Sequence, residues 1–326
     1  MRSMRIKNTE YFAIQRKIVA NVTTESWQNV PHVSYMYEPD VTAFFAEYKR
    51  LNRNRSGENK VTLNTLMLKV ITEGLKAAPV MNSHIEFNRK LVRGRIDTFE
   101  NIDISMPTVL PNGEMMTINL HDFGEKDLDE MTAYINDVRR RAEKTNLAEA
   151  MYSVSIDNTM KNLRKGKIFQ TIGRIYGANI GNSKAKHMRG KRKKEYEAIP
   201  ATERLTLDDL KQGTVTVSNI GSTYLGQKGA MALLEIVPPQ VCAISVGAVQ
   251  DKPMVVTDSK GNKDIEARSV LPLCIAFDHR ALDFGDIVPF MKRLDEIFGD
   301  PTVIHSWISD QSRELDRRKD FLTVVA

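Results

Sequence analysis

Apolar residues recur every three or four positions along several stretches of the chain, which is the spacing of one face of an α-helix. These stretches are residues 40–51, 64–79, 126–144 and 287–298. Near the start of each stands a polar residue that can cap a helix N-terminus: Asp40, Asn64, Asp127 and Asp286. The pattern therefore predicts four helices, the second of them apolar on most sides and hence buried.

Apolar runs of strand length dominate the chain after about residue 210. They occupy residues 215–220, 240–249, 252–256 and 270–277, and an earlier pair within 105–120 is joined by a Pro-Asn-Gly turn. The stretch IAFDHRALDFGD, residues 275–286, follows the last of these strands and leads into the last helix. His279 is therefore predicted at a strand end, directly before a helix.

Composition restricts the class of protein. The chain has 326 residues, 41% of them hydrophobic, so it can fill a sizeable core. Its N-terminus lacks the apolar segment of a secretion signal, and no run of about 18 apolar residues could span a membrane. Cys242 and Cys274 each stand in an apolar strand, which favours buried, reduced thiols and a cytoplasmic location.

Positive charge is concentrated in residues 161–194, which hold twelve Lys or Arg and no acid, within a net charge of +6. Apolar residues at helical spacing accompany the cations: Ile168, Phe169, Ile172, Ile175 and Tyr176. A solvated loop or a subunit contact is the favoured interpretation. An anionic membrane surface, an acidic carrier domain or the phosphates of coenzyme A remain alternatives. No nucleic-acid recognition motif is present, so no nucleic-acid partner is expected.

Candidate chemistry centres on His279. Imidazole has an intrinsic pKa near 6.5 and can take a proton from a thiol or hydroxyl, and Asp283, four positions later, could orient it. A core histidine with satisfied hydrogen bonds and an Asp that only caps a turn would leave the same pattern.

The other histidines are not candidates for catalysis or metal binding. His32 is predicted to be structural. The remaining histidines share no ligand spacing with Cys, Asp or Glu, so no metal site is expected. These histidines are His84, His121, His187 and His305. Nicotinamide and ATP motifs are also lacking.

Several motifs resemble the catalytic domain of the acyltransferases of 2-oxo-acid dehydrogenase complexes (dihydrolipoamide acyltransferases), relatives of chloramphenicol acetyltransferase. DHRALD is similar to the family's D-H-R-x-x-D-G, GTVTVSNIGS to G-T-F-T-I-S-N-L-G, and EIVPPQVCAISVGAV to N-P-P-Q-x-A-I-L-G-V-G. Near the start, RKIVANVTTESWQNVPHVSYMYEPDVTAF follows the family's R-K-x-I-A helix, x-P-H strand and D-V-T helix start. The resemblance covers residues 12–148 and 203–300. It implies an α/β fold, a two-layer sandwich of a mixed sheet and packed helices.

The resemblance also implies roles for four residues. His279 matches the general base, Ser218 the hydroxyl that stabilises the oxyanion, Asp283 the orienting carboxylate, and Arg16 the arginine that pairs with that carboxylate. No covalent acyl-enzyme is expected. Family members are trimers, in which His279 of one chain would face Ser218 of its neighbour, and the trimers can assemble further. The implied activity is acyl exchange between coenzyme A and a thiol of the dihydrolipoyl type or another small acceptor.

The sequence departs from the family in three ways. Phe284 stands where the motif has glycine, which would alter the substrate channel. Residues from about 149 to 202 form a basic insertion within what otherwise reads as one catalytic domain over 1–326. The sequence shows no lipoyl attachment site and no lipoyl or subunit-binding domain. We therefore expect the chain to work alone, to use a free acceptor, or to receive acyl groups from a lipoyl or carrier domain in trans. The alternative is a non-catalytic trimeric scaffold or a membrane-peripheral assembly module with the same fold.

Overall fold

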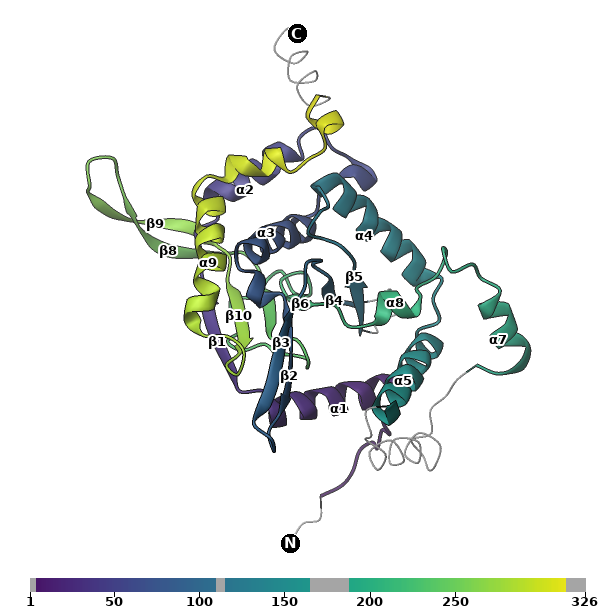
Figure 1. Ribbon diagram of the computed structural model, residues 1–326. Helices are drawn as coiled ribbons and strands as arrows, with labels where there is room; N and C mark the ends of the chain where they lie inside the picture. Colours follow the sequence, from purple (N-terminus) through teal and green to yellow (C-terminus); the bar gives the residue numbers. More distant parts are fainter. Residues whose placement is uncertain (1–3, 110–114, 165–187, 315–326) are drawn as a thin grey trace. The chain divides into compact units, whose positions relative to one another are not determined.

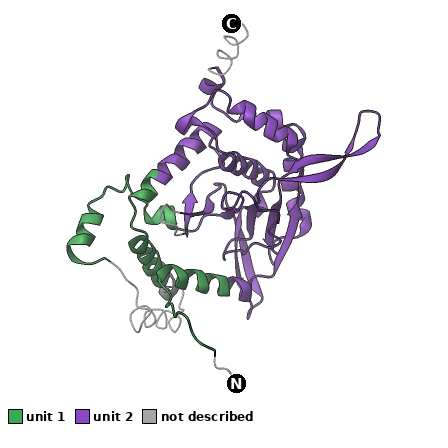
Figure 2. Ribbon diagram, turned by 180° about the vertical axis from the view of Figure 1, so that it is seen from behind, with its two compact units in different colours: residues 1–25, 140–211 green, residues 26–139, 212–326 purple. Residues whose placement is uncertain are grey.

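The computed structural model describes residues 4–109, 115–164 and 188–314, and the chain divides into two compact units (Figures 1 and 2). One unit contains residues 1–25 and 140–211, and the other contains residues 26–139 and 212–326. His279, Asp283 and Ser218 belong to the second unit, and Arg16 belongs to the first. The single catalytic domain expected from the sequence stays a prediction.

The centre of the second unit is a six-stranded mixed sheet with the strand order β1-β10-β7-β6-β4-β5 (Figure 1). Strands β4, β6 and β7 run parallel to one another, and the other neighbours are antiparallel. The predicted α/β class with a mixed sheet is confirmed. The strands are β1 (His32–Tyr37), β4 (Ile104–Val109), β5 (Met115–Leu120), β6 (Val215–Asn219), β7 (Cys242–Val246) and β10 (Leu273–Asp278).

Two antiparallel ribbons lie outside this sheet. One consists of β2 (Ser83–Asn88) and β3 (Arg93–Thr98), and the other of β8 (Gln250–Thr257) and β9 (Lys263–Val270). The β8–β9 ribbon projects from the rest of the second unit (Figure 1). The predicted pair of strands within residues 105–120 is confirmed as the β4–β5 pair, in which Val109 stands opposite Met115. The predicted Pro-Asn-Gly turn between them lies outside the described residues. Cys242 and Cys274 are free and buried, as expected, and burial raises the pKa of both thiols.

The helices of the second unit follow the predicted stretches. They are α2 (Thr42–Leu51), α3 (Leu63–Ala77), α9 (Phe284–Gly299) and most of α4 (Leu128–Glu143), with short 3-10 helices η1 (Gly57–Asn59), η2 (Pro79–Met81) and η3 (Pro301–Ser306). Helix α9 packs on the β1 side of the sheet, where the Tyr37 hydroxyl donates to Asp295 at 2.5 Å. The rings of Tyr37 and Phe44 both pack against Phe298 near the end of α9.

Three of the four predicted helix caps are wrong. Helix α2 begins at Thr42 with Val41 as its N-cap, although the Asp40 carboxylate accepts from the Thr42 N–H at 2.9 Å. Helix α3 begins at Leu63, and its cap is Thr62, whose hydroxyl accepts from the Thr65 N–H, rather than Asn64. Helix α9 begins at Phe284 with Asp283 as its N-cap. Asp286 instead completes a capping box from the third helical position, since its carboxylate accepts from the Asp283 N–H at 2.8 Å. Side-chain spacing could not distinguish these neighbouring polar residues.

The first unit contains α5 (Leu147–Arg164), α7 (Gly190–Glu197), α8 (Leu207–Leu210) and most of α1 (Ile14–Asn29). Arg141 donates to Asp209 at 2.9 Å. Burial raises the pKa of Asp209, but hydrogen bonds from Arg141 and Thr206 outweigh that effect and lower it overall. The apolar helical spacing expected at 168–176 lies outside the described residues.

Asp103 joins three strands at one end of the sheet. Its backbone carbonyl accepts from the Thr214 N–H before β6 at 2.7 Å, and its carboxylate accepts from the Asp122 N–H after β5 at 2.9 Å. His121 lies 3.4 Å from the same carboxylate. Burial by itself would raise the pKa of Asp103. The hydrogen bonds from His121, Asp122 and Asn101 prevail and lower that pKa to about 2.

Helices α3 and α9 approach closely at Gly74. An added Cβ there would lie 2.6 Å from the Phe290 ring and 2.7 Å from Leu294, and both of these side chains are fully buried. Gly74→Ala is therefore expected to reduce the free energy of unfolding by about 1–2 kcal/mol, since overpacking outweighs the better helix propensity of alanine. Urea unfolding measures this change. Gly299→Ala, where nothing lies within 4 Å, is the control, and equal midpoints for the two variants would contradict the close approach.

The lowered pKa of Asp103 predicts a pH-dependent contribution to stability. A carboxyl group whose folded pKa lies below its unfolded value stabilises the fold above the unfolded pKa, and that stabilisation is lost as the pH falls toward about 2. Asp103→Asn should cost about 2 kcal/mol at pH 7 and progressively less below pH 4. Urea unfolding of both proteins across this pH range provides the measurement. A difference that stays constant with pH would show that ionisation of Asp103 is unimportant.

Candidate active site

The five residues between β10 and α9 form a tightly hydrogen-bonded corner. The carbonyl of Asp278, the last residue of β10, accepts from the N–H groups of Ala281 at 2.9 Å and Leu282 at 3.0 Å. The His279 N–H donates to the Pro31 carbonyl at 3.0 Å. Asp283 then caps α9. The backbone of His279 is therefore held from both sides of the corner and by the chain that leads into β1.

A buried ion pair braces this corner. Asp278 is fully buried, and its carboxylate accepts from Arg280 Nε at 3.0 Å, from a terminal guanidinium nitrogen at 2.6 Å and from the Arg280 N–H at 2.9 Å. The guanidinium also lies over the Phe87 ring, 5.9 Å from its centroid. Asp278 and Arg280 flank His279 in the sequence, so this pair restricts the conformation of the residue between them.

The His279 ring is oriented through Nδ1. This atom lies 3.1 Å from the Leu282 carbonyl oxygen and 3.3 Å from Asp283 Oδ1. A carbonyl oxygen only accepts, so Nδ1 carries the hydrogen and the lone pair of the neutral ring resides on Nε2. The side chain is 51% exposed, and within the described residues no hydrogen bond occupies Nε2. The ring can therefore accept a proton from a bound molecule.

Asp283 lies where the sequence predicted an orienting carboxylate. It is 3.3 Å from Nδ1, and its side chain is 82% exposed. So exposed an ion pair contributes little energy, whereas the Leu282 carbonyl is fixed in the corner. The carbonyl is therefore the main orienting group, and Asp283 supplements it. Arg16 occupies an exposed position of α1 in the first unit, and its pairing with Asp283 stays a prediction.

Ser218 lies far from His279 within the chain. Across the sheet it is in register with Ser245, which in turn is opposite Cys274. Cys274 is five residues before His279, so the two candidate residues are separated by about 16 Å along the strands and about 10 Å across them. Because β10 runs antiparallel to β6 and β7, they stand at opposite ends of the sheet.

They also face opposite sides of the sheet. Side chains alternate along a strand, so Ser218, Ser245 and Cys274 share one face while Phe277 points to the other. The His279 ring contacts Phe277 edge-on, with centroids 6.0 Å apart, and so lies on the Phe277 side. A single chain does not bring the two groups together.

The surroundings of Ser218 hold its strand end firmly. Asn219 donates to Asn64 at 2.8 Å, and its side-chain oxygen accepts from the Ser222 N–H at 3.0 Å. At Gly221 an added Cβ would lie 2.3 Å from the Gly247 carbonyl oxygen, so only glycine fits there. Ser218 itself is half-buried, and no hydrogen bond to its hydroxyl is found among the described residues. Its hydroxyl is available to a bound group.

The interpretation of His32 as structural agrees with its contacts. Its Nδ1 lies 2.8 Å from the Val30 carbonyl oxygen, and its Nε2 accepts from the Ile236 N–H at 3.1 Å. Buried Ser26 donates to the Ile236 carbonyl at 2.7 Å beside the ring. Both ring nitrogens are therefore occupied, in contrast to those of His279.

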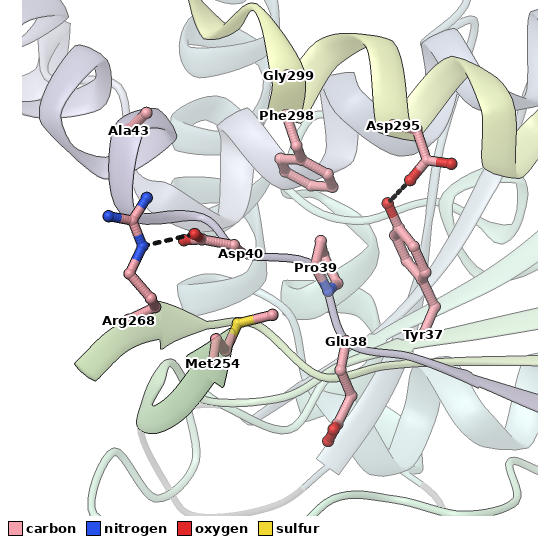
Figure 3. A pocket seen from close by; sticks show the side chains of 10 residues that line it. All are labelled: Tyr37, Glu38, Pro39, Asp40, Ala43, Met254, Arg268, Asp295, Phe298 and Gly299. Atoms are coloured by element: carbon pink, nitrogen blue, oxygen red, sulfur yellow. Dashed lines mark hydrogen bonds and ion pairs between the residues drawn. The ribbon is translucent and has the colours of Figure 1, made fainter. Parts of the chain in front are cut away.

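A pocket of about 470 Å³ lies near the C-terminal end of β1, away from His279 (Figure 3). Its carboxylates are already engaged by neighbouring groups. Arg268 pairs with Asp40 at 2.7 Å, and the Tyr37 hydroxyl donates to Asp295. Within residues 4–109, 115–164 and 188–314, no cluster of three His, Cys, Asp or Glu could hold a metal ion. In those ranges no helix has the length and hydropathy of a membrane span.

Sequence motifs place this chain in a known family. Residues 5–156 and 191–306 match the family described as 2-oxoacid dehydrogenases acyltransferase (catalytic domain). The chain belongs to this family. The unmatched residues between these ranges fall inside the predicted basic insertion.

Relatives of the acyltransferase family agree with this assignment. The dihydrolipoyllysine-residue acetyltransferase component of the mitochondrial pyruvate dehydrogenase complex of Schizosaccharomyces pombe is 25% identical over 289 residues, which cover 89% of this chain and 45% of the relative. The corresponding component from Mycobacterium bovis is 25% identical over 283 residues, covering 86% and 39%. The chain thus spans less than half the length of these relatives.

Solved structures of the family show the same fold. The cubic core of the pyruvate dehydrogenase multienzyme complex superposes with a TM-score of 0.59 at 19% identity, covering 92% of this chain and 94% of the other. The dihydrolipoamide acetyltransferase of Azotobacter vinelandii gives a TM-score of 0.59 at 20% identity with the same coverage. A serine, a histidine and an asparagine of that enzyme have been investigated for their role in its catalytic mechanism.

The Asp278–Arg280 pair was missed from the sequence, although both residues stand beside His279. Arg280→Met leaves a fully buried carboxylate without its cation and should destabilise the acyltransferase fold by about 3–5 kcal/mol. Adding Asp278→Asn removes that charge and should recover much of the loss. Urea unfolding of the single and double variants measures the coupling. Arg313→Met is the control, because its exposed pair with Asp310 should contribute under about 1 kcal/mol. Equal effects of Arg280→Met and Arg313→Met would contradict the role of the buried pair.

Proposed function

We propose that this chain exchanges acyl groups between coenzyme A thioesters and a thiol acceptor of the dihydrolipoyl type, or a similar small acceptor. The observation that carries the proposal is the His279 ring, whose Nδ1 is committed to the Leu282 carbonyl and whose Nε2 is open. Family membership supports the same chemistry. Coenzyme A is a substrate here, and the acceptor thiol is carried by a lipoyl or carrier domain or belongs to a free small molecule.

The reaction needs one proton carrier and one oxyanion donor. Nε2 of His279 removes the proton from the acceptor thiol, and the sulfur attacks the carbonyl carbon of the thioester. The Ser218 hydroxyl donates a hydrogen bond to the oxygen of the tetrahedral intermediate. The carbon–sulfur bond to coenzyme A then breaks, and the imidazolium returns its proton to the departing thiolate. No covalent intermediate on the chain is required.

We infer that each active site combines two chains, His279 from one and Ser218 from the next. Support comes from the sheet, which places these residues at opposite ends and on opposite faces of one chain. A closed ring of identical chains repeats such a site at every interface, and we propose a homotrimer that can assemble further. A relative forms the cubic core of a pyruvate dehydrogenase complex.

We assign supporting roles to Asp283 and Arg16. In the Azotobacter vinelandii enzyme the asparagine follows the histidine by four residues, and Asp283 follows His279 at the same spacing. Asp283 therefore assists in holding the ring, and Arg16 would pair with it as in the family motif. The two free, buried thiols suit a reducing compartment such as the cytoplasm.

Complementation between two inactive variants tests the proposal. His279→Ala and Ser218→Ala, each alone, should lose most of the transfer from acetyl-CoA to dihydrolipoamide, measured by the release of coenzyme A. When the two variants are co-expressed with different tags and co-purified, one interface type contains both intact residues. A trimer that carries both tags has one such interface out of three, so about a third of the activity of the unaltered protein should return.

Two controls define the outcome. His305→Ala removes a histidine that is paired with Glu47 at 2.7 Å outside the corner and should leave activity unchanged. Co-expression of the unaltered chain with a chain that carries both substitutions measures the effect of mixing alone. Activity retained by His279→Ala would remove the base from the proposal. No transfer from either acetyl-CoA or a bulkier acyl-CoA by the unaltered protein would favour the scaffold alternative.

A further inference from the structure

We infer that Phe284, held by Tyr35, is a specificity-determining residue that favours acyl groups carrying an aromatic ring over the acetyl group. The inference rests on the proposed function. Phe284 immediately follows Asp283, whose carboxylate lies 3.3 Å from the base candidate. The family motif has glycine at this position, so the side chain departs from that motif.

The Phe284 ring is fixed rather than free. It packs against the ring of Tyr35 in β1 with centroids 5.3 Å apart and planes inclined at 59°. Phe284 is also the first residue of α9 and lies within the capping box formed by Asp283 and Asp286, so its backbone is set by the helix. Such a tilted aromatic pair is a favourable arrangement, and it gives the second ring a defined place.

This aromatic pair lies on the same side of the sheet as the His279 ring. Tyr35 is opposite Ile275 and Val33 is opposite Phe277, so these four side chains share a face. The edge-on contact with Phe277 directs His279 to that face as well. The pair and the base therefore border one region, at the β1 edge of the sheet.

The pair offers an apolar surface that the described residues of the second unit leave partly exposed. Phe284 is 49% exposed and Tyr35 is half-buried. An acetyl group extends only one carbon beyond its carbonyl, so it has little apolar surface to place on the ring. An aryl acyl group has further atoms to place on the ring, and it gains both area burial and an aromatic contact. Glycine would offer neither.

Acyl-donor preference tests the inference in the assembled protein. The ratio of kcat/KM for phenylacetyl-CoA to that for acetyl-CoA, with dihydrolipoamide as acceptor, should fall about tenfold in Phe284→Ala. The value for acetyl-CoA should change less than about threefold. Phe284→Tyr keeps the ring and should retain the ratio of the unaltered protein. Gly285→Ala, at the next position, where nothing lies within 4 Å, is the matched control and should also retain it.

The outcomes separate the two proposals. Transfer of both acyl groups with a ratio unchanged in Phe284→Ala would overturn the role of Phe284 while leaving the acyltransferase intact. A ratio that rises in Phe284→Ala would overturn it too, because the ring would then obstruct large acyl groups. Absence of transfer with either donor in the unaltered protein would instead refute the proposed function. Mass measurement of the assembly shows that each variant retains its oligomeric state.

Discussion

The proposed chemistry of this chain depends on one hydrogen bond, from Nδ1 of His279 to the carbonyl of Leu282. The bond selects the tautomer, because a carbonyl oxygen cannot donate, and it leaves the lone pair on the exposed Nε2. The Leu282 carbonyl has a fixed position, because the N–H of Leu282 donates a hydrogen bond to the carbonyl of Asp278 within the corner. A side chain as exposed as Asp283 would hold the ring less firmly, since water competes for it.

Burial of the Asp278 carboxylate in this corner costs free energy. A fully buried carboxylate at Asp278 is unfavourable unless its oxygens are satisfied, and Arg280 supplies three hydrogen-bond donors to it. Asp278 and Arg280 flank His279 in the sequence, so the hydrogen bonds that stabilise the carboxylate also restrict the backbone of His279. The neighbouring aromatic pair consists of Tyr35 and Phe284, the first residue of α9. Their contact places an aromatic ring where the family motif has glycine.

Strand direction decides how a complete site could form. Because β10 returns antiparallel to β6 and β7, its C-terminal end lies opposite the end that bears Ser218. Adjusting a loop cannot reunite residues at opposite ends and on opposite faces of a sheet. The proposed two-chain site follows from this arrangement, and it explains how a chain with a base and an oxyanion donor far apart could still catalyse acyl transfer.

The sequence by itself predicted the helices, most of the strands, the family and the candidate residues His279, Ser218 and Asp283, because periodicity and motif spacing are local properties. It misplaced the starts of α3 and α9, where adjacent polar residues compete to cap and only backbone geometry selects Thr62 and Asp283. Tertiary structure alone revealed the orienting carbonyl of Leu282, the burial of Asp278 and the separation of Ser218 from His279. Those features depend on which groups meet in space, and residue identity does not encode a carbonyl's direction or a strand's neighbour.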